Sequence, residues 1–456
     1  MTLGSRNQSA MSQKRRYSLV GTGGRAVLFV DALADTRQDH CCLVSMCDMS
    51  QVRMDYYNQY LEDSHKHASV PTFKPDRFKE MVETTRPDIV IVCTTDVMHH
   101  EYIIRAMDAG CDVICEKPMT VDAAKVQAIH DAIQRTGKSL RVTFNLRYWP
   151  LAIKVRELLV QGTIGRPMAV DFSYVLDTSH GADYFRRWHR EKDKSGGLLV
   201  HKSTHHFDLV NWWIDGQPRS VYALGDLKFY GKSNAQSRGE HYDYDRYTDE
   251  AKAQNDPFSM PLDGKDSRGF SGTVLRSLYR DAEAETGYIR DRNVFGEGIT
   301  IEDTMAVMVR YDNGVVLNYS LVTYSSWEGF RLAITGDKGR LEVYVKYGSH
   351  IIAGQSRDES AKAQGDQYQE RLEVFPMFGH PYKVDVPKAE GSHFGCDAIM
   401  TDQLFSQDAV PDPLNCAASE ADATASVMVG VCANESMRTG LPVNCLELLG
   451  RIPPAE

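Results

Sequence analysis

The hydrophobic positions of this chain fall into two different patterns. From residue 15 to residue 144, continuous apolar runs such as Ile89–Cys93 alternate with segments whose apolar residues recur every three or four positions, as at Val126, Ile129 and Ile133. The first pattern indicates strands buried on both faces, and the second indicates amphipathic helices. Their repeated alternation predicts an α/β fold that begins with a doubly wound parallel sheet.

A different pattern follows Pro150. We expect a helix over residues 151–160, a strand over 168–175 and, beyond Ser220, mainly strands, at 221–224, 304–311, 315–322, 331–335 and 341–345. Asn313-Gly314, between two of these runs, is a dipeptide preferred in tight hairpins. Consecutive strands joined by short turns indicate a second, α+β domain built on a mostly antiparallel open sheet.

We expect three parts in this chain of 456 residues, which is longer than one ordinary domain. They are a disordered N-terminal tail (1–13), the parallel-sheet domain (14–145) and the C-terminal α+β domain (146–456). Within the last, residues 231–298 are polar, lack apolar periodicity and are too long for an ordinary connection. This long insertion is expected to cross over a cleft or over the subunit surface.

Composition and charge narrow the classes of function. Hydrophobic residues make up 42% and charged residues 25% of the chain, as in globular proteins, and the net charge of −10 argues against a nucleic-acid partner. We expect no membrane partner and no secretory leader, because no apolar span is long enough for either. The ten cysteines form no CxxC pair, which favours reduced thiols and a cytoplasmic location.

A glycine-rich turn follows the first strand. Tyr17–Val20 leads into Gly21-Thr22-Gly23-Gly24-Arg25-Ala26, a G-x-G-x-x-A pattern between a strand and a helical segment. In that context the glycines permit a tight turn and the close approach of a dinucleotide pyrophosphate. Asp48 ends the second strand, where a carboxylate can accept the adenosine ribose hydroxyls and would repel a 2′-phosphate. NAD is therefore favoured over NADP, unless Asp48 is a plain turn residue.

The segment Gly196–Trp213 carries a stripe of polar residues on an otherwise apolar background. Its spacing predicts a partly buried helix on which His201, His205 and Asp208 share one face. Buried imidazoles and carboxylates need partners or a task, so these three are either hydrogen-bonded groups in a domain interface or part of a site. A metal site on the two histidines would lack further ligands, and we expect no metal.

Together these residues resemble the Gfo/Idh/MocA family of sugar and inositol oxidoreductases. The resemblance covers nearly the whole chain and takes in, in order, the glycine turn, Thr94-Thr95-Asp96 with His99, Glu116-Lys117-Pro118, Asn145–Tyr148, His205-x-x-Asp208, Gly336–Leu341 and Ala433–Ser436. It implies a Rossmann NAD(P)-binding domain over 14–145 and a carbohydrate or polyol substrate between the two domains. It also implies a homodimer or homotetramer formed through the C-terminal sheet.

The resemblance further implies roles for single residues. Many members have Asp where this chain has His201, and Gly where it has Ser203. We expect His205 to be the base, Lys117 its electrostatic partner beside the nicotinamide, and His201 a relay or a substrate ligand. The expected cofactor contacts are Gly21, Thr22, Gly23, Gly24, Arg25, Asp48, Thr94, Thr95, His99, Glu116 and Lys117. The expected substrate contacts are Asn145, Arg147, Tyr148, His180, Tyr184, Trp188 and Asp208.

These expectations favour an NAD-dependent dehydrogenase that transfers a hydride between nicotinamide and a hydroxyl carbon of a sugar, glycoside or cyclitol. The alternative is an NAD-dependent glycoside hydrolase, in which transient C3 oxidation and elimination cleave the glycosidic bond before the hydride returns. The additional histidines His180, His189 and His201 would allow its second base. A sensor that binds NAD and sugar without turnover would have no need of Lys117 and His205.

Overall fold

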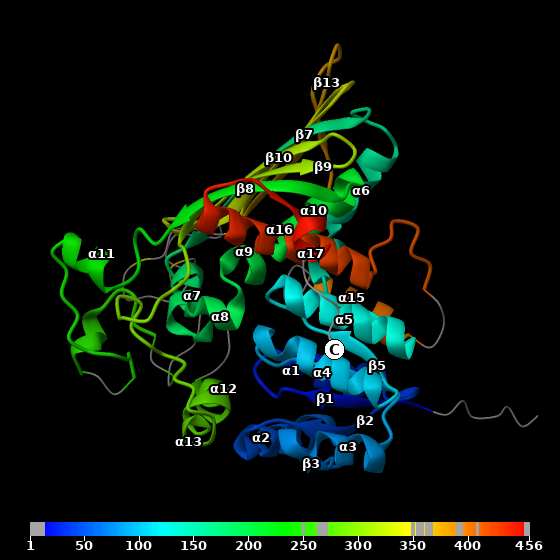
Figure 1. Cartoon of the computed structure of the whole chain (residues 1–456), viewed down its shortest axis with the longest axis vertical. Coiled ribbons are helices and arrows are strands. Elements are labelled where there is room, and N and C mark those ends of the chain that lie inside the picture. Colours follow the sequence, from blue (N-terminus) through cyan, green and yellow to red (C-terminus); the bar gives the residue numbers. More distant parts are fainter. Residues whose placement is uncertain are drawn as a thin grey trace, which may run out of the picture.

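The computed structural model describes residues 14–248, 251–260, 262, 272–347, 352, 360, 368–388, 395–406 and 410–450. The expected tail, residues 1–13, lies outside the described residues. Two sheets organise the rest, and Figure 1 shows them one above the other with helices between them. The α/β fold class is confirmed, with a parallel sheet in the N-terminal part and a mostly antiparallel sheet in the C-terminal part.

The first sheet has six strands in the order β3-β2-β1-β4-β5-β6, and all of its pairs are parallel. Because β1 lies between β2 and β4, the strand order reverses beside the glycine turn, which is where such sheets bind ligands. Its strands are β1 (Arg15–Val20), β2 (Cys41–Cys47), β3 (Thr72–Phe73), β4 (Ile89–Val92), β5 (Asp112–Cys115) and β6 (Leu140–Val142).

Helices cover both faces of this sheet, as the alternating pattern predicts. They are α1 (Ala26–Asp31), which continues into the π-helix η1 (Ala32–Thr36), α2 (Gln51–His65), α3 (Phe78–Thr85), α4 (His99–Asp108) and α5 (Ala123–Thr136), with the 3₁₀ turns η2 (Pro75–Arg77), η3 (Asp96–Met98) and η4 (Asn145–Tyr148).

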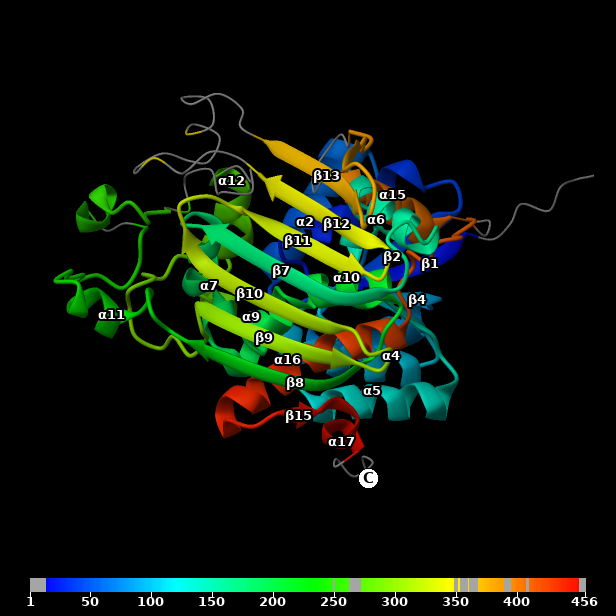
Figure 2. The same cartoon turned by 90° about the horizontal axis from the view of Figure 1, so that it is seen from above.

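The second sheet has nine strands in the order β14-β13-β12-β11-β7-β10-β9-β8-β15. Figure 2 shows the central strands of this sheet side by side above the helices. Among the strand pairs that the structure describes in this sheet, only the central β7–β10 pair is parallel, and Gly314 forms the expected hairpin between β9 and β10 with a φ of +87°. The strands are β7 (Pro167–Asp177), β8 (Pro218–Asp226), β9 (Thr304–Tyr311), β10 (Val316–Ser325), β11 (Gly329–Gly336), β12 (Gly339–Lys346), β13 (Gln369–Pro376), β14 (Tyr382–Val384) and β15 (Val443–Asn444).

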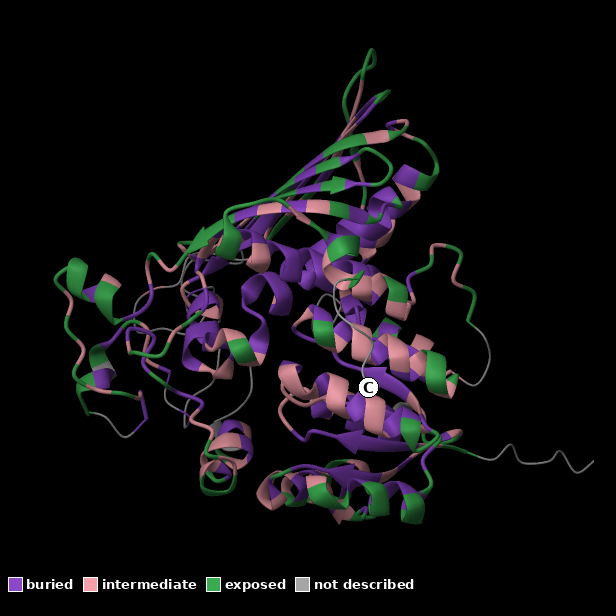
Figure 3. Ribbon diagram, viewed as in Figure 1, coloured by how far each residue is buried: buried purple, intermediate pink, exposed green. Residues whose placement is uncertain are grey.

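The inner face of the nine-stranded sheet is buried beneath helices, and Figure 3 shows this layer as the most buried part of the molecule. The central helices are α10 (Thr204–Ile214), buried along its whole length, and α16 (Glu420–Thr439), which begins with a capping box at Ser419. The remaining helices are α6 (Pro150–Val160), α7 (His180–Arg186), η5 (Trp188–Arg190), α8 (Lys192–Ser195), α9 (Leu198–His201), α15 (Cys396–Phe405) and α17 (Cys445–Gly450).

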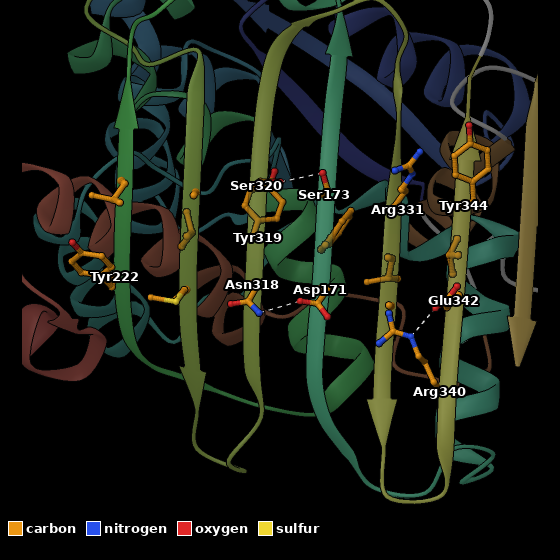
Figure 4. A pocket seen from close by; sticks show the side chains of 18 of the residues that line it. Asp171, Ser173, Tyr222, Asn318, Tyr319, Ser320, Arg331, Arg340, Glu342 and Tyr344 are labelled. Atoms are coloured by element: carbon orange, nitrogen blue, oxygen red, sulfur yellow. Dashed lines mark hydrogen bonds and ion pairs between the residues drawn. The ribbon is translucent and has the colours of Figure 1, made fainter. Parts of the chain in front are cut away.

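The outer face of the same sheet is open and hollowed. A cavity of about 670 Å³ lies across its central strands, as Figure 4 shows. Its floor combines polar pairs, such as Asn318 with Asp171 at 3.0 Å, with apolar side chains. Among these, Leu224 is 60% exposed and Met308 is 51% exposed. Such a surface on a sheet face is typical of an interaction site.

The described residues of the expected insertion, 231–298, form short helices. They are α11 (Lys232–Ser237), η6 (Ala251–Asn255), α12 (Gly272–Leu275), the π-helix η7 (Arg276–Arg280) and α13 (Glu283–Thr286). Figure 1 shows α12 and α13 reaching towards α2 of the parallel sheet, and η7 contacts α2.

Two further observations concern the chain as a whole. In the described ranges there is no helix with both the length and the apolarity needed to cross a bilayer. All ten cysteines are free thiols, and eight of them are buried.

Candidate active site

The glycine turn at the end of β1 is shaped by close packing against β4. Gly21 has a φ of +90°, and a Cβ at this position would stand 2.6 Å from the backbone carbon of Cys93. Any other residue would therefore be strained and would push the turn away from the sheet. In contrast, a Cβ on Gly23 would meet only the Tyr279 hydroxyl, at 4.0 Å, so the outer side of the turn faces open space.

Asp48 lies where β2 ends, at the same edge. Its Oδ2 accepts a hydrogen bond from the backbone N–H of Thr22 (2.7 Å), and its Oδ1 accepts one from the N–H of Ser50 (2.8 Å). The hydroxyl of Thr22 is buried and has no partner within the protein. An open glycine turn and a carboxylate at the end of the second strand are features of dinucleotide sites, and the unpartnered hydroxyl of Thr22 is available to a ligand, so these residues fit an NAD(P) dinucleotide.

Arg25 links the glycine turn to two other parts of the chain. Its Nε donates to Glu116 Oε1 (2.8 Å), and its Nη1 and Nη2 donate to the two oxygens of Asp397 on α15 (2.9 and 3.0 Å). Asp397 Oδ1 also accepts a hydrogen bond from Asn145 Nδ2 (2.8 Å). The structure thus brings together Arg25, Glu116 and Asn145 through a carboxylate that is 372 residues from Arg25 in the chain.

Lys117 follows Glu116 and reaches the C-terminal part. Its Nζ donates to the backbone carbonyl of His201 at 3.3 Å. Burial lowers the pKa of Lys117, while the carboxylates of Asp96 and Glu116 oppose that shift. The contact of Lys117 with His201 joins the end of β5, in the parallel sheet, to the end of α9 in the C-terminal part.

The expected single helix over Gly196–Trp213 is wrong. The segment forms α9 and α10, separated by a turn at Lys202 and Ser203. The carbonyl of His201 receives the Lys117 ammonium, and the N–H of Ser203 turns back to the carbonyl of Leu198 (2.9 Å). These contacts end α9, and Asp208 therefore does not share a continuous helix with His201.

His201 is paired with Asp96, which sequence reasoning placed in a motif but gave no role. His201 Nδ1 lies 2.5 Å from Asp96 Oδ2, and both side chains are nearly enclosed. Burial raises the pKa of Asp96 and lowers the pKa of His201, because it disfavours the charged form of each group. This contact turns His201 Nδ1 away from any ligand and leaves its Nε2 as the free ring nitrogen.

His205 lies near the same lysine. Burial, followed by the positive charge of Lys117, lowers the pKa of His205 well below its usual value. Its Nδ1 is buried without a partner in the protein, and Phe144 packs edge-on against the ring at 5.9 Å. His205 is therefore a neutral imidazole at neutral pH, and its Nδ1 makes no hydrogen bond to another residue.

Aromatic side chains surround His201 on its other side. The rings of Tyr184 and Trp188 lie 5.6 and 5.8 Å from it, and His189 stacks on Trp188 at 3.7 Å. His180 Nε2 lies 3.1 Å from the Tyr184 hydroxyl, and its Nδ1 lies 2.9 Å from Glu328 Oε1. Three of the expected substrate contacts, His180, Tyr184 and Trp188, are thus gathered beside the Lys117–His201 contact.

The other expected substrate contacts are occupied by structural partners. Arg147 donates to both oxygens of Asp208, from Nε at 2.8 Å and from Nη2 at 2.7 Å, and their side chains are 1% and 2% exposed. Tyr148 is also buried, at 5% exposure. A substrate has no access to Arg147 or Asp208 in this structure, so we do not retain them as substrate contacts.

His99, which follows the end of β4, supports the site from within the protein and is not accessible to a ligand. His99 is 1% exposed; its Nδ1 lies 2.8 Å from the carbonyl of Pro118, and its Nε2 lies 3.2 Å from that of Thr94. It therefore holds the turn after Lys117 against the end of β4. Thr94 and Thr95 are half-buried at the sheet edge.

Several residues of the site were missed in the sequence, because their partners are far away in the chain. Asp397 and Glu328 lie in stretches of sequence without a recognisable pattern, and Tyr279 lies in the polar insertion. The Tyr279 hydroxyl accepts a hydrogen bond from the N–H of Gly24 at 3.0 Å. Within the described part of the chain, no cluster of three or more His, Cys, Asp or Glu side chains is arranged to hold a metal ion.

Two family profiles match the chain. Residues 15–144 match the profile described as "Oxidoreductase family, NAD-binding Rossmann fold". Residues 156–444 match the profile described as "Oxidoreductase family, C-terminal alpha/beta domain". The boundary between the two matches falls close to the point where the parallel sheet ends.

Individual proteins are similar over different shares of the chain. "Putative oxidoreductase YteT" of Bacillus subtilis (strain 168) is 34% identical over 394 residues, 84% of this chain and 87% of that protein. "D-glucoside 3-dehydrogenase" of Escherichia coli (strain K12) is 31% identical over 161 residues, 35% of this chain and 43% of that protein. The fold is shared with a crystal structure of an oxidoreductase from Agrobacterium radiobacter in complex with NAD+, L-tartaric acid and magnesium. That match has a TM-score of 0.59 at 15% identity and covers 96% of this chain and 100% of that chain.

Proposed function

The chain belongs to the Gfo/Idh/MocA oxidoreductase family, and from that membership we propose an NAD-dependent dehydrogenase that acts on a hydroxyl carbon of a sugar, glycoside or cyclitol. One observation carries the proposal. The Lys117 ammonium at the end of β5 contacts the carbonyl of His201, which joins the edge that fits a dinucleotide to the histidines of the second half. Bound NAD would supply the hydride acceptor, and the protein must supply the base and the geometry.

His205 accepts the hydroxyl proton in this proposal. Its lowered pKa keeps the imidazole neutral at neutral pH, which a general base requires. The ammonium of Lys117 stabilises the negative charge that develops on the substrate oxygen, because buried charges act strongly over short distances. Asp96 fixes the ring of His201, which directs its Nε2 to a second hydroxyl or relays the proton.

The proposed substrate class follows from the side chains gathered around His201. Tyr184 and Trp188 present aromatic faces, and His180 with Glu328 presents hydrogen-bonding groups, a combination that suits a ring bearing many hydroxyls. A sugar or cyclitol also agrees with two relatives, an inositol 2-dehydrogenase and a D-glucoside 3-dehydrogenase. NAD rather than NADP is proposed because Asp48 would repel a 2′-phosphate.

The open face of the nine-stranded sheet is the proposed surface of self-association. Its exposed apolar side chains and the polar pairs between them form one continuous face, which would be buried in a homodimer or homotetramer. The site described above lies on the opposite side of the sheet.

A second function is favoured by a further histidine beside His201. The ring of His189 lies 4.1 Å from that of His201, so a further base stands close to the first site. An NAD-dependent glycoside hydrolase needs such a base to remove the proton next to a transient C3 ketone. Its net reaction would leave NAD unchanged.

One experiment tests both functions. The purified full-length protein is incubated with NAD+ and a panel of glycosides, free sugars and inositols, while NADH absorbance and released sugar are measured together. The dehydrogenase predicts NADH in proportion to the substrate consumed, whereas the hydrolase predicts released sugar without net NADH. If no compound of the panel gave either product, both proposals would be overturned.

A further inference from the structure

A carboxylate of the insertion lies against the first turn of α2. Glu285, on α13, is 235 residues from Ser50 in the chain. Its Oε2 accepts hydrogen bonds from the hydroxyl of Ser50 (2.6 Å) and from the backbone N–H of Val52 (3.2 Å). Glu285 thus occupies donors at the start of a helix of 15 residues, where the helix dipole favours a negative charge.

This first turn directly follows Asp48, the residue positioned for the adenosine ribose. A phosphate on the ribose 2′-hydroxyl would be directed at the same region, because anions bind readily to the N–H groups that begin a helix. In this protein the hydroxyl of Ser50 and the N–H of Val52 already face Glu285. The 2′-phosphate would therefore meet two carboxylates, those of Asp48 and Glu285, instead of free donors.

The insertion also contacts the positively charged side chains near the first turn of α2. Arg53 Nε donates to the carbonyl of Leu278 (2.7 Å), and its guanidinium lies 5.4 Å from the centre of the Tyr279 ring. Lys74 Nζ donates to the carbonyl of Met49 (2.7 Å) and lies 4.0 Å from Glu285 Oε1. Arginine is the side chain that accommodates a 2′-phosphate in dinucleotide sites, and here it is held by backbone of the insertion.

We propose that Glu285 is a specificity-determining residue, which excludes the 2′-phosphate of NADP from the first turn of α2 and so selects NAD. This inference rests on the proposed function, because it concerns the same dinucleotide site. Selection of this kind works by repulsion and by occupied donors, and it needs no additional attraction to NAD.

The experiment compares nucleotide affinities in three variants of the full-length protein freed of bound nucleotide. NAD+ and NADP+ are titrated calorimetrically into wild type, Glu285→Gln, Glu285→Ala and Glu283→Gln. Glutamine keeps an oxygen for Ser50 and thus keeps the insertion docked. Glu283 is the matched control, because it lies on the same short helix but pairs with Arg246. Thermal unfolding checks that each variant is folded.

We expect both Glu285 variants to bind NADP+ about tenfold more tightly than wild type, because a nearby like charge is removed, while NAD+ affinity changes by less than about threefold. Glu283→Gln should behave as wild type. An unchanged ratio of the two affinities in Glu285→Gln, or a wild type that prefers NADP+, would overturn the inference and leave Glu285 as a docking contact only. If wild type bound neither nucleotide, the proposed function itself would be overturned.

Discussion

The ion pair between Arg147 and Asp208 decides whether the acid of the His205-x-x-Asp208 motif has a structural or a catalytic task. The pair is bidentate, and both side chains are almost completely enclosed. Asp208→Asn preserves the shape of the side chain but removes its charge. Because Arg147 holds the carboxylate and both side chains are enclosed, this change should lower stability and have little effect on substrate binding.

The magnitude follows from what remains around Arg147. Removing one partner of a buried ion pair costs about 3–5 kcal/mol, because the other charge stays buried without compensation. Arg147 keeps Asp422 at 3.2 Å and the carbonyl of Asn415 at 3.1 Å. The lower end, about 3 kcal/mol, is therefore expected, which corresponds to a fall in melting temperature of about 3 °C for a chain of 456 residues.

Calorimetric melting and steady-state kinetics at 25 °C, read together, separate the two interpretations. Asp422→Asn is the control: its carboxylate also contacts Arg147 but is 35% exposed, and it caps α16, so a loss of about 1 kcal/mol is expected. An Asp208→Asn variant that melted like wild type while its KM rose more than about tenfold would refute the reasoning. Asp208 would then contact the substrate.

Three more predictions address the site. Lys117→Ala and His205→Ala should each lower turnover by ~10²–10⁴ while calorimetry shows that NAD still binds, and wild-type turnover in either variant would contradict its assigned role. Burial and the charge of Lys117 lower the pKa of His205, so kcat/KM should stay constant as the pH falls to about 6.5, the ordinary pKa of histidine, and should decrease only at lower pH. A decrease that begins above about pH 6.5 would exclude His205 as the base. Asp48→Ala should weaken NAD binding and reduce the discrimination against NADP, as measured by titration with both nucleotides.

Local patterns were sufficient to predict most of the fold. The apolar runs and the three-to-four spacing predict the strands of the parallel sheet, several of its helices and the hairpin at Asn313-Gly314. The helix α2 was missed although its buried residues Met54, Tyr57 and Leu61 are three and four positions apart, because polar residues dominate the positions between them. Nor do local patterns predict β3, which has two residues and exists only through its pairing with β2.

The site was less predictable, because its geometry depends on distant contacts. Strand ends and the glycine turn identify Gly21, Asp48 and Lys117 from neighbours in the sequence. The break between α9 and α10 depends on Lys117, which is 84 residues from His201. No periodicity in the helix itself could show that interaction. The role of the insertion could not be predicted either, because Glu285 and Tyr279 act through contacts with α2 and Gly24, which are distant in the sequence.

Two contacts of the site cross between the halves of the molecule. His201 Nδ1 meets Asp96 Oδ2, from the turn after β4, and the Lys117 ammonium, from the end of β5, meets the carbonyl of His201. Separating the halves would break both contacts together and would also move Lys117 away from His205. Burial is the first cause of the lowered pKa of His205, and the charge of Lys117 is the second. The electrostatic setting of the proposed base therefore depends on the packing of the two halves against each other.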